Sequence, residues 1–493
     1  MRPKITIIGA GPGGLTAGIL LQKRGFEVTI YEKDGGPGGR NQAIELGDYR
    51  FDTGPTFLMM KYFLDEIFTE TGRDINDYLD FYDLEPLYTL VFKDKKMVHY
   101  KDKSKMKAEI EEYFPGESEG YDRLMEYEKE RYSRLYPCLK KDYSYLKRMV
   151  EPDILYAFPY LQLHKTMYQA LGTYFHSEDL KLAFTFQAKY LGMSPWSCPA
   201  LFTMVPYIEH EYGIYHVKGG LNKISHAMAK VFAEEGGTIV YNTPVKELIT
   251  NFGQALGVVL ENCEKVYSDD VVINSDFAYS FSNLYKDSSK WSPKKLKGKE
   301  YSCSTFMLYL GLDKKYDLPH HSIYFADDYK ANIDDISLYR KVGEDFSVYI
   351  QNASVTDPTL APEGHSTIYI LVPITNLKSG VDWTSFGSEF RDKVMAVLKD
   401  KVGLTDIEDH IKEEKVITPQ DWSRDYNVFL GATFNLGHGI NQMLYFRPHN
   451  RFEELENCFL VGGGTHPGSG LPTIYESGRI SAKMICKKHG IKY

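Results

Sequence analysis

One stretch near the N-terminus limits the fold more than any other part of this chain. Residues 4–8 are apolar and β-branched, which predicts a short buried strand of a parallel sheet. Gly9, Gly11 and Gly14 follow in the pattern G-x-G-x-x-G. The first glycine permits a tight turn, the second lets a pyrophosphate approach the backbone, and the third lets a helix pack closely on the strand. Glu32 stands eighteen residues after Gly14, where a carboxylate accepts hydrogen bonds from an adenosine ribose.

The segments between the glycines and Glu32 complete the pattern. Residues 13–23 have apolar side chains at helical spacing, and residues 27–31 have the composition of a second strand. The N-terminal amides and the dipole of such a helix favour an anion. A glycine motif alone is a weak signal, but strand, turn, helix, strand and acid in register form a strong one. The sequence therefore predicts a Rossmann-type dinucleotide-binding domain.

Two further glycine-rich segments favour FAD over a nicotinamide cofactor. A second glycine turn follows the acid and leads into residues 51–56, and a glycine-dense loop over 462–470 lies between a predicted strand and a predicted helix. A flavin extends beyond its ADP half, and its anionic reduced ring gains from a helix N-terminus, whereas a nicotinamide cofactor does not need this third element. The alternative is a glycine-rich surface loop. The predicted flavin contacts in these segments are Gly39, Arg40, Gly54, Pro55, Thr56, Gly463, Gly464, Gly470 and Leu471.

The composition of the whole chain excludes several classes of function. A length of 493 residues suggests two or three domains. A net charge of -9 argues against nucleic acid as a partner, and no apolar run is long enough for a membrane-spanning helix. The sequence shows no signal peptide, and its six cysteines include no C-x-x-C pair. We therefore expect a cytoplasmic protein without a metal site.

The middle of the chain has a different composition from the rest. Between residues 113 and 215, 22 of 103 residues are Tyr, Phe or Trp, and the periodicity is mostly helical. Aromatic residues in helices usually fill a core, but here they interrupt the nucleotide-binding elements, as an inserted cap over an apolar channel would. Alternating runs over 301–373 predict an antiparallel sheet. The predicted division is FAD-binding parts over 1–72, 216–285 and 425–493, substrate-domain parts over 73–112 and 286–424, and a helical cap over 113–215.

Two lysine-rich segments suggest contact with a membrane surface. Seven lysines lie between residues 93 and 107, and six lie between 286 and 299 around Trp291, a residue type common at membrane interfaces. Each basic residue near an anionic bilayer contributes about 1 kcal/mol of attraction. Ordinary solvated surface is the alternative.

Three segments resemble the bacterial and fungal carotenoid (phytoene) desaturases, within the amine-oxidase-like flavoproteins. The similarity covers residues 8–40 with 51–56, residues 192–220, and residues 457–477, where Gly-Thr-His-Pro-Gly-x-Gly is close to diagnostic. Typical members have Ala-Gly or Gly-Ser in place of Gly463-Gly464. That departure leaves the branch open among desaturase, hydroxycarotenoid dehydrogenase, terminal oxidase and saturase.

The resemblance implies both a fold and a reaction. It implies an α/β fold with a Rossmann-type FAD domain, an antiparallel substrate sheet and a helical cap, and it implies that Val245 contacts the adenine through its backbone. It also implies a peripheral membrane protein that introduces conjugated double bonds into a linear precursor such as phytoene or dehydrosqualene. Quinone or oxygen is the expected electron acceptor.

The expected reaction needs only a weak base from the protein. Hydride loss beside a conjugated system leaves an allylic cation whose neighbouring proton is acidic, so a weak base suffices. Glu209 and Glu211, on either side of His210, are candidates, with a solvated turn as the alternative. His466 is a further candidate, which alternatively only shapes the flavin loop.

Rival functions fit parts of the sequence. One is a flavin oxidase acting on an amine or a carotenoid end group, and another is a polyene saturase. A third, from a different class, is a non-catalytic polyprenoid carrier that keeps FAD as a structural part. The complete set of phosphate, ribose and ring-side motifs argues against the carrier, which would not need the reactive edge of the flavin.

Overall fold

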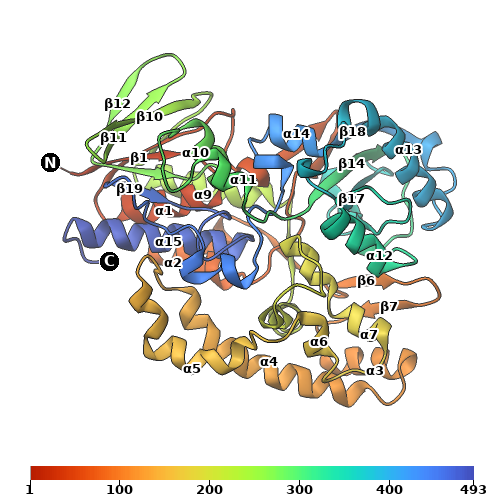
Figure 1. Cartoon of the computed structure of the whole chain (residues 1–493). Coiled ribbons are helices and arrows are strands. Elements are labelled where there is room, and N and C mark those ends of the chain that lie inside the picture. The colour runs from red at the N-terminus through yellow and green to blue at the C-terminus, as the bar shows by residue number, and fades with distance from the viewer. Residues whose placement is uncertain (1) are drawn as a thin grey trace.

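The computed structural model describes residues 2–493, apart from the side chain of Tyr190. A parallel-sheet part lies on the left of Figure 1, an antiparallel sheet on the right, and a row of helices along the bottom. This arrangement confirms the predicted α/β class with a nucleotide-binding domain, a second sheet and a helical cap. The limits assigned to the domains remain predictions. No described helix combines the length and the apolar character needed to cross a bilayer.

The first sheet is parallel throughout, and its strands come from three distant parts of the chain. Its order is β19-β13-β1-β2-β9, with β1 at the centre. The strands are β1 (Lys4–Ile8), β2 (Glu27–Tyr31), β9 (Thr238–Val240), β13 (Asp270–Ile273) and β19 (Cys458–Leu460). β1 and β2 have the predicted bounds. A central parallel strand is buried on both faces, which explains the continuous apolar run at the start of the sequence.

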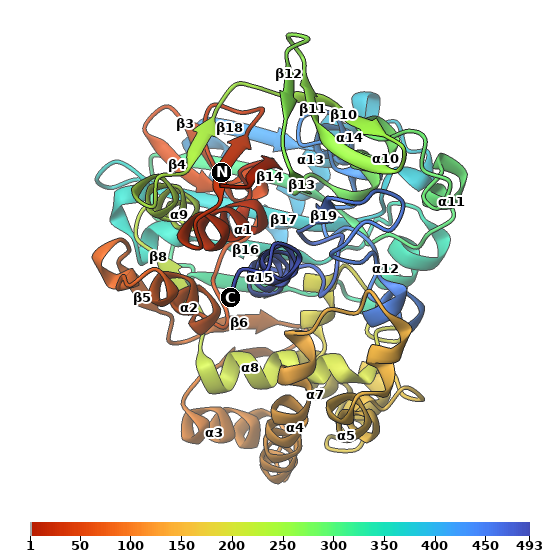
Figure 2. The ribbon, with the colours of Figure 1, turned by 90° about the vertical axis from the view of Figure 1, so that its left-hand side faces the viewer.

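Three helices pack beside this sheet: α1 (Pro12–Lys23), α9 (Asn222–Glu234) and α15 (Leu471–Lys488). α1 buries nine consecutive residues, Gly13 to Leu21, so it is enclosed on all sides. It lies between α9 and α15, as Figure 2 shows. A Cβ at Gly18 would meet Ile30 and Phe232 at 3.1 Å, so this glycine lets α9 and β2 approach α1.

The second sheet has seven strands in the order β18-β14-β17-β16-β15-β6-β7. Neighbours are antiparallel except β6 and β15, which are parallel. The strands are β6 (Tyr88–Val91), β7 (Lys96–His99), β14 (Ser304–Leu312), β15 (His321–Tyr324), β16 (Val348–Gln351), β17 (Ser366–Ile374) and β18 (Ile411–Ile417). α13 (Trp383–Asp400) covers one face, where Phe306 and Phe390 meet edge to face. The opposite face presents tyrosines to the parallel-sheet part.

The cap consists of helices that lie below both sheets in Figure 2. They are α3 (Lys103–Tyr113), α4 (Ser118–Leu139), α5 (Pro152–Leu161), α6 (Met167–Leu171), α7 (Glu178–Ala183) and α8 (Met204–Tyr212). A buried ion pair fixes α4 to the chain that precedes α8. Arg131 contacts Glu128 at 2.9 Å and donates to the Ala200 carbonyl at 2.7 Å. Burial raises the pKa of Glu128 to about 7, despite the opposing effect of Arg131.

The segment 113–215, predicted to be mostly helical, contains helices separated by irregular stretches. α7 ends at Ala183 and is followed by 3-10 turns, and α4 ends at Leu139. β15 lies within the antiparallel sheet predicted over 301–373, whereas β18 lies outside that range and was not predicted, because its alternation of apolar and charged residues is incomplete. Trp291 is only 7% exposed and packs against Phe277. Its expected role as an interface anchor was therefore wrong.

Candidate cofactor and active site

The first glycine turn joins β1 to α1, and its backbone is not covered by side chains. Gly9 adopts a φ of +97°, and a Cβ at Gly14 would lie 2.3 Å from the Gly9 carbonyl oxygen. Only glycine therefore lets α1 begin this close to β1. A Cβ at Gly11 would approach the Asn274 side chain to 3.0 Å, and that amide donates to the Gly9 carbonyl at 3.0 Å. The turn presents bare backbone at the N-terminus of α1, as an anion site requires.

The second glycine turn lies directly against the first. The Gly38 amide donates to the Ala10 carbonyl at 2.9 Å. Gly39 adopts a φ of +56°, and its Cβ position is 4.0 Å from the Cα of Gly11. The two turns, predicted separately, thus form one glycine-lined surface.

Arg40 places a cation beside this surface. Its guanidinium donates to the Thr433 carbonyl at 2.7 Å, and burial lowers its pKa while Asp276 opposes that shift. A Cβ at Gly54 would lie 2.9 Å from the Arg40 carbonyl oxygen, so the segment around Gly54 also touches this turn.

Glu32 stands at the end of β2 with both carboxylate oxygens engaged by backbone amides. Ala10 donates to one oxygen at 2.6 Å and Asp34 to the other at 2.9 Å. Burial raises the pKa of Glu32, and these amides oppose the shift. A carboxylate has about four acceptor positions, so capacity remains for ligand hydroxyls. The Thr243 amide donates to the Glu32 carbonyl at 2.8 Å, which brings the start of β10 (Val245–Asn251), and with it Val245, beside Glu32.

The C-terminal glycine loop closes on the first turn from the other side. A Cβ at Gly13 would lie 3.3 Å from the Gly462 amide nitrogen, and one at Gly478 in α15 would lie 2.6 Å from the Gly13 carbonyl oxygen. A Cβ at either Gly463 or Gly464 would approach a neighbouring side chain to 2.7 Å. Backbone therefore packs on backbone between segments from opposite ends of the chain.

A buried arginine holds this loop from behind. Arg447 is 1% exposed and donates to the carbonyls of Gly463 at 2.6 Å and Thr465 at 3.1 Å. Burial lowers its pKa to about 9. His438 accepts a hydrogen bond from the Ser469 amide at 3.1 Å. Neither Arg447 nor His438 was predicted, because both lie outside any motif and act on backbone groups that are distant in sequence.

The loop ends at the N-terminus of α15. Gly470 adopts a φ of +114°, and Leu471 is the first helical residue. The positive end of the helix dipole therefore meets the glycine loop, as the sequence predicted for the ring side of a flavin.

Three tyrosines of the seven-stranded sheet hold residues 53–56. Their hydroxyls lie on one face of the sheet, toward the parallel-sheet part. Tyr309, Tyr369 and Tyr349 bond respectively to the Thr53 carbonyl at 2.7 Å, the Gly54 carbonyl at 3.0 Å and Thr56 Oγ1 at 2.7 Å. They fix the backbone on both sides of Pro55. None of the three tyrosines was predicted, because cross-strand register cannot be derived from alternation alone.

Tyr349 also contacts a buried histidine, His321. Its hydroxyl lies 2.8 Å from His321 Nδ1, so Thr56, Tyr349 and His321 form a hydrogen-bonded chain. Burial and the nearby His216 lower the pKa of His321 to about 3, so the ring is neutral at pH 7. Its Nε2 has no hydrogen-bond partner among the described residues.

Glu209 lies in a buried network between the cap and the seven-stranded sheet. Tyr88 of β6 donates to its carboxylate at 3.0 Å and Gln187 donates at 2.9 Å. The neighbouring His210 contacts His99 at 3.3 Å, and burial lowers the pKa of His210 to about 3. The alternative of a solvated turn is therefore wrong for Glu209 and His210.

The other two acid–base candidates have different surroundings. Glu211 forms an ion pair with Lys103 at 2.8 Å near the surface. His466 is 2% exposed and packs edge-on against Tyr143, with ring centroids 4.8 Å apart. Burial and the charge of Arg447 lower the pKa of His466 to about 3, so it carries no charge at pH 7.

Comparison with known proteins identifies the family. The model of the family described as flavin containing amine oxidoreductase matches residues 12–486. The chain belongs to this family. It is 54% identical over 491 residues to a 4,4'-diapophytoene desaturase (4,4'-diapolycopene-forming) of Methylomonas sp., covering 99% of this chain and 96% of the relative. It is 37% identical to an all-trans-zeta-carotene desaturase of Myxococcus xanthus, covering 99% and 94% of the two chains.

More distant relatives agree with this assignment. A lycopene-forming phytoene desaturase of Pantoea ananas is 31% identical, with coverage of 98% and 99%. Among solved structures, a redesigned putrescine oxidase aligns with a TM-score of 0.65 at 12% identity, covering 99% of each chain. An oxidoreductase from Methanosarcina mazei aligns with a TM-score of 0.63 at 14% identity, covering 98% and 100%. These structures share the fold of this chain, whose relatives place it among the FAD-dependent carotenoid desaturases.

The glycine surfaces and Glu32 fit FAD. Gly9, Gly11 and Gly14 would hold the diphosphate, with Gly39 and Arg40 beside it. Glu32 would hold the ribose and Val245 would contact the adenine. The remaining predicted contacts, Gly54 to Thr56 and Gly463 to Leu471, lie where bare backbone, a helix N-terminus and the neutral His321 chain would surround the ring.

A buried carboxyl of α15, that of Glu476, was not predicted. Glu476 has no exposed surface, and its neighbours are Arg479 at 3.3 Å on the same helix, together with the charges of Lys483, Lys140 and Glu66. Burial raises the pKa of Glu476 to about 8, so its carboxyl is mostly protonated at pH 7.

We expect Gly11→Val to abolish FAD binding without unfolding the protein. The added side chain would fill the place where the diphosphate meets backbone, and no packed core residue would change. Absorbance of the purified protein in the flavin region measures the loss. Gly172→Val is the matched control, because a Cβ at Gly172 comes no closer than 3.5 Å to its neighbours and the site lies in the cap. Equal yellow colour in both variants would contradict the assigned site.

We expect Tyr349→Phe to retain FAD but to slow flavin reduction by substrate about tenfold, the usual effect of one lost hydrogen bond of ~1.4 kcal/mol. Anaerobic stopped-flow absorbance measures the rate. Tyr309→Phe is the control, because its hydroxyl holds the same segment through the Thr53 carbonyl only. If both variants slow reduction equally, the chain to His321 has only a structural role.

We expect Glu476→Gln to stabilise the protein increasingly as pH rises from about 4.5 to about 8. A carboxyl whose folded pKa is raised favours folding at low pH, and ionisation above its unfolded pKa progressively disfavours the folded state until the folded pKa is reached. The difference at pH 8 amounts to at most about 4 kcal/mol. Thermal unfolding at pH 5 and pH 8 measures it. An equal change in Tm at the two pH values would show that the carboxyl titrates normally.

Proposed function

We propose that this enzyme introduces conjugated double bonds into a linear thirty-carbon polyene of the diapophytoene type. The observation that supports this substrate is the 54% identity to a 4,4'-diapophytoene desaturase along almost the whole of both chains. Relatives that act on zeta-carotene or phytoene are more distant, at 37% and 31% identity. A forty-carbon substrate is therefore the second candidate.

The residues of the site mainly bind and orient the cofactor and the substrate, and they exclude water. Bound FAD supplies a two-electron acceptor. The glycine surfaces would let it approach the backbone, and the three tyrosines fix residues 53–56, which would lie beside the ring. A polyene has no polar group to bind, so its affinity comes from buried apolar area, at about 25 cal/mol per Å².

The proton released by desaturation needs a weak acceptor within the protein. The chain from Thr56 through Tyr349 to His321 Nδ1 offers one, since each hydroxyl can accept a proton while passing its own onward. His321 is neutral and would receive that proton. Glu209 is the candidate on the cap side, because it is buried and hydrogen-bonded to Tyr88. Glu211, paired with Lys103, and His466, held against Tyr143, are weaker candidates.

Two partners follow from this function. A long polyene dissolves in lipid rather than in water, which favours peripheral contact between the enzyme and a bilayer. The reduced cofactor must also pass its electrons onward, and quinone or oxygen is the proposed acceptor.

The substrate is tested by anaerobic mixing of the FAD-loaded enzyme with diapophytoene or phytoene in liposomes. We expect diapophytoene to bleach the flavin faster, with absorption growing at longer wavelength as conjugation lengthens. Faster bleaching by phytoene would contradict the thirty-carbon substrate and favour the forty-carbon one. NADPH with a conjugated polyene is the second arm. Reaction of that pair, with the more saturated polyenes inert, would make the enzyme a saturase, and bleaching by amines alone would make it an amine oxidase.

A further inference from the structure

Large apolar side chains gather on one exposed part of the cap and the adjacent C-terminal loop. Their exposed fractions run from 40% at Leu163 to 68% at Tyr156. We call this set the apolar face. Its members are Tyr145, Leu146, Val150, Leu155, Tyr156, Phe158, Leu163, Ile440 and Phe446.

The exposed apolar side chains of α5 take no part in packing this helix against the rest of the protein. α5 turns Ile154 and Ala157 inward, where they pack with Cys138 and Tyr143. Leu155, Tyr156 and Phe158 lie on the remaining surface of the same helix and are each more than half exposed. A helix that is apolar on all sides is normally enclosed by other apolar material. The protein supplies that material on one side of α5 only.

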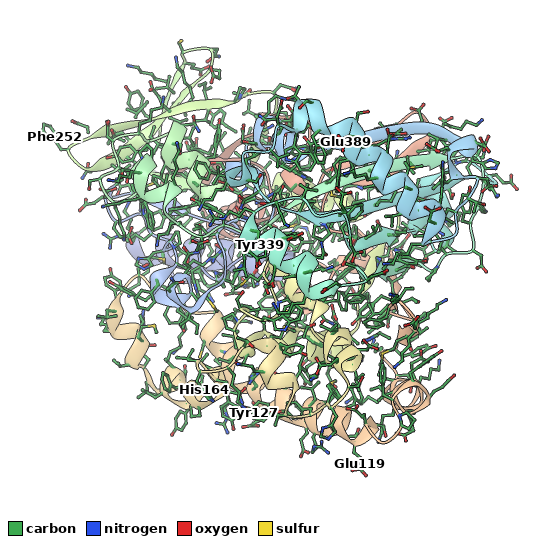
Figure 3. The ribbon with its side chains drawn as sticks, turned by 45° about the vertical axis from the view of Figure 1, so that its right-hand side comes forward. Glu119, Tyr127, His164, Phe252, Tyr339 and Glu389 are labelled. Atoms are coloured by element: carbon green, nitrogen blue, oxygen red, sulfur yellow. The ribbon has the colours of Figure 1, made fainter. Side chains whose placement is uncertain are left out.

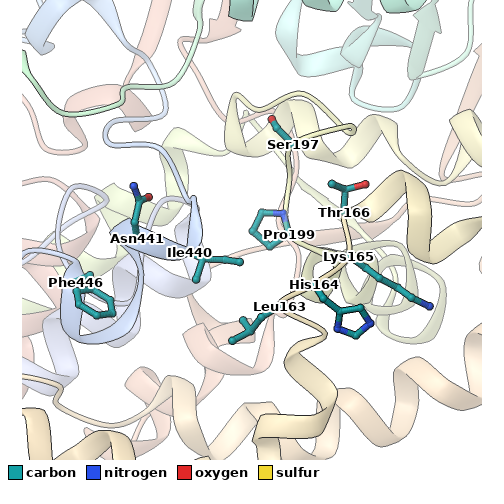
Figure 4. Close-up of a pocket in the computed structure, with 9 residues that line it drawn as sticks. All are labelled: Leu163, His164, Lys165, Thr166, Ser197, Pro199, Ile440, Asn441 and Phe446. Atoms are coloured by element: carbon teal, nitrogen blue, oxygen red, sulfur yellow. The ribbon is translucent and has the colours of Figure 1, made fainter.

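The two segments of the apolar face form one continuous surface. Leu163 and Pro199 from the cap and Ile440 and Phe446 from the loop line a hollow of about 530 Å³, together with the polar residues His164, Lys165, Thr166, Ser197 and Asn441. Figure 4 shows these residues from the two segments. Arg451 joins the segments again by donating to the Tyr145 hydroxyl at 3.0 Å.

The hollow lies close to the cofactor loop. Ile440 and Phe446 are in the segment between His438 and Arg447, the two residues that hold the C-terminal glycine loop. From the cap side, Pro199 begins a turn that carries Phe202, whose ring lies 6.1 Å from that of His438. The hollow therefore borders the two segments that adjoin the residues holding the cofactor loop.

We propose that the apolar face docks on a lipid bilayer and that the hollow receives the polyene from it. This surface rests on the proposed function, because only a lipid-soluble substrate requires it. Nearby Lys147 and Lys165 are positioned to meet lipid headgroups while the apolar side chains enter the acyl region. A bilayer matches both this chemistry and the source of the substrate.

The lysine-rich segments of the sequence are less suited to docking. In the first, Lys95, Lys101, Lys103 and Lys107 form ion pairs with carboxylates of the chain. The second surrounds Trp291, which is buried. In Figure 1, β7 and α3 of the first segment lie at the lower right, whereas α11 (Pro293–Lys297) of the second lies at the upper centre. One flat membrane would not easily contact both.

The double variant Leu155→Asp/Phe158→Asp tests the apolar face, because both side chains are largely exposed and outside the hollow. Phe252→Asp is the matched control, with a side chain 98% exposed in a region well away from His164 and the cap (Figure 3). The FAD-loaded proteins are sedimented with neutral phosphatidylcholine vesicles. We expect the double variant to lose roughly tenfold or more of the vesicle affinity, and the control to bind like the parent.

A turnover assay distinguishes a failure of the docking surface from a failure of the proposed function. Polyene is supplied either in liposomes or in detergent micelles. We expect the double variant to lose product formation from liposomes about tenfold and to keep it from micelles, with unchanged flavin absorbance and Tm. Parental vesicle binding by the double variant would overturn the docking surface. Binding of the parent to anionic vesicles only, with loss of binding at high salt, would also overturn the docking surface. It would assign the membrane contact to the lysine-rich segments instead. A parent that binds vesicles but makes no product from either source would overturn the proposed function alone.

Discussion

The close contact between the two ends of the chain is the constraint on which the rest of the structure depends. Gly13 and Gly14 at the start of α1 meet Gly9, Gly462 and Gly478, and a Cβ at Gly13, Gly14 or Gly478 would lie between 2.3 and 3.3 Å from backbone atoms of these segments. Because backbone packs on backbone, the N-termini of α1 and α15 both reach one elongated site. The second sheet and the cap are inserted between them in the sequence, and the chain must return from both to this contact.

Buried polar groups serve mainly to position backbone in this enzyme. Arg447 has carbonyl partners on the glycine loop, and the tyrosines of the second sheet bond to carbonyls of residues 53 and 54. Removing a buried partner of this kind costs about 1–3 kcal/mol, because the group left behind is unsatisfied. Such contacts therefore fix geometry more than they add stability. They bring the second sheet, which has no nucleotide motif, into the cofactor site.

Local features of the sequence predicted the nucleotide-binding part well. β1, β2 and their glycine turn follow from spacing within thirty or so residues, where side-chain size and backbone freedom decide the structure. Contacts set by tertiary register were not predictable. Tyr349 meets Thr56 only because β16 is placed opposite residues 53–56, and Arg447 meets Gly463 only after the loop folds back. The lysine segments illustrate the same limit, since the carboxylate partners of Lys95 and Lys103 come from other elements.

Polar and apolar groups lie on different sides of the C-terminal glycine loop. On the parallel-sheet side of the glycine loop, amides, Glu32 and Arg40 form a site for a charged cofactor. On the cap side, the same loop adjoins His438, Phe202 and the hollow. A charged cofactor would meet the C-terminal glycine loop from the parallel-sheet part, and a hydrocarbon would meet it from the cap. Both parts contact this loop, since Gly13 packs on Gly462 and Tyr143 packs on His466. One loop would in this way serve two ligands of different polarity, each held by a separate part of the chain.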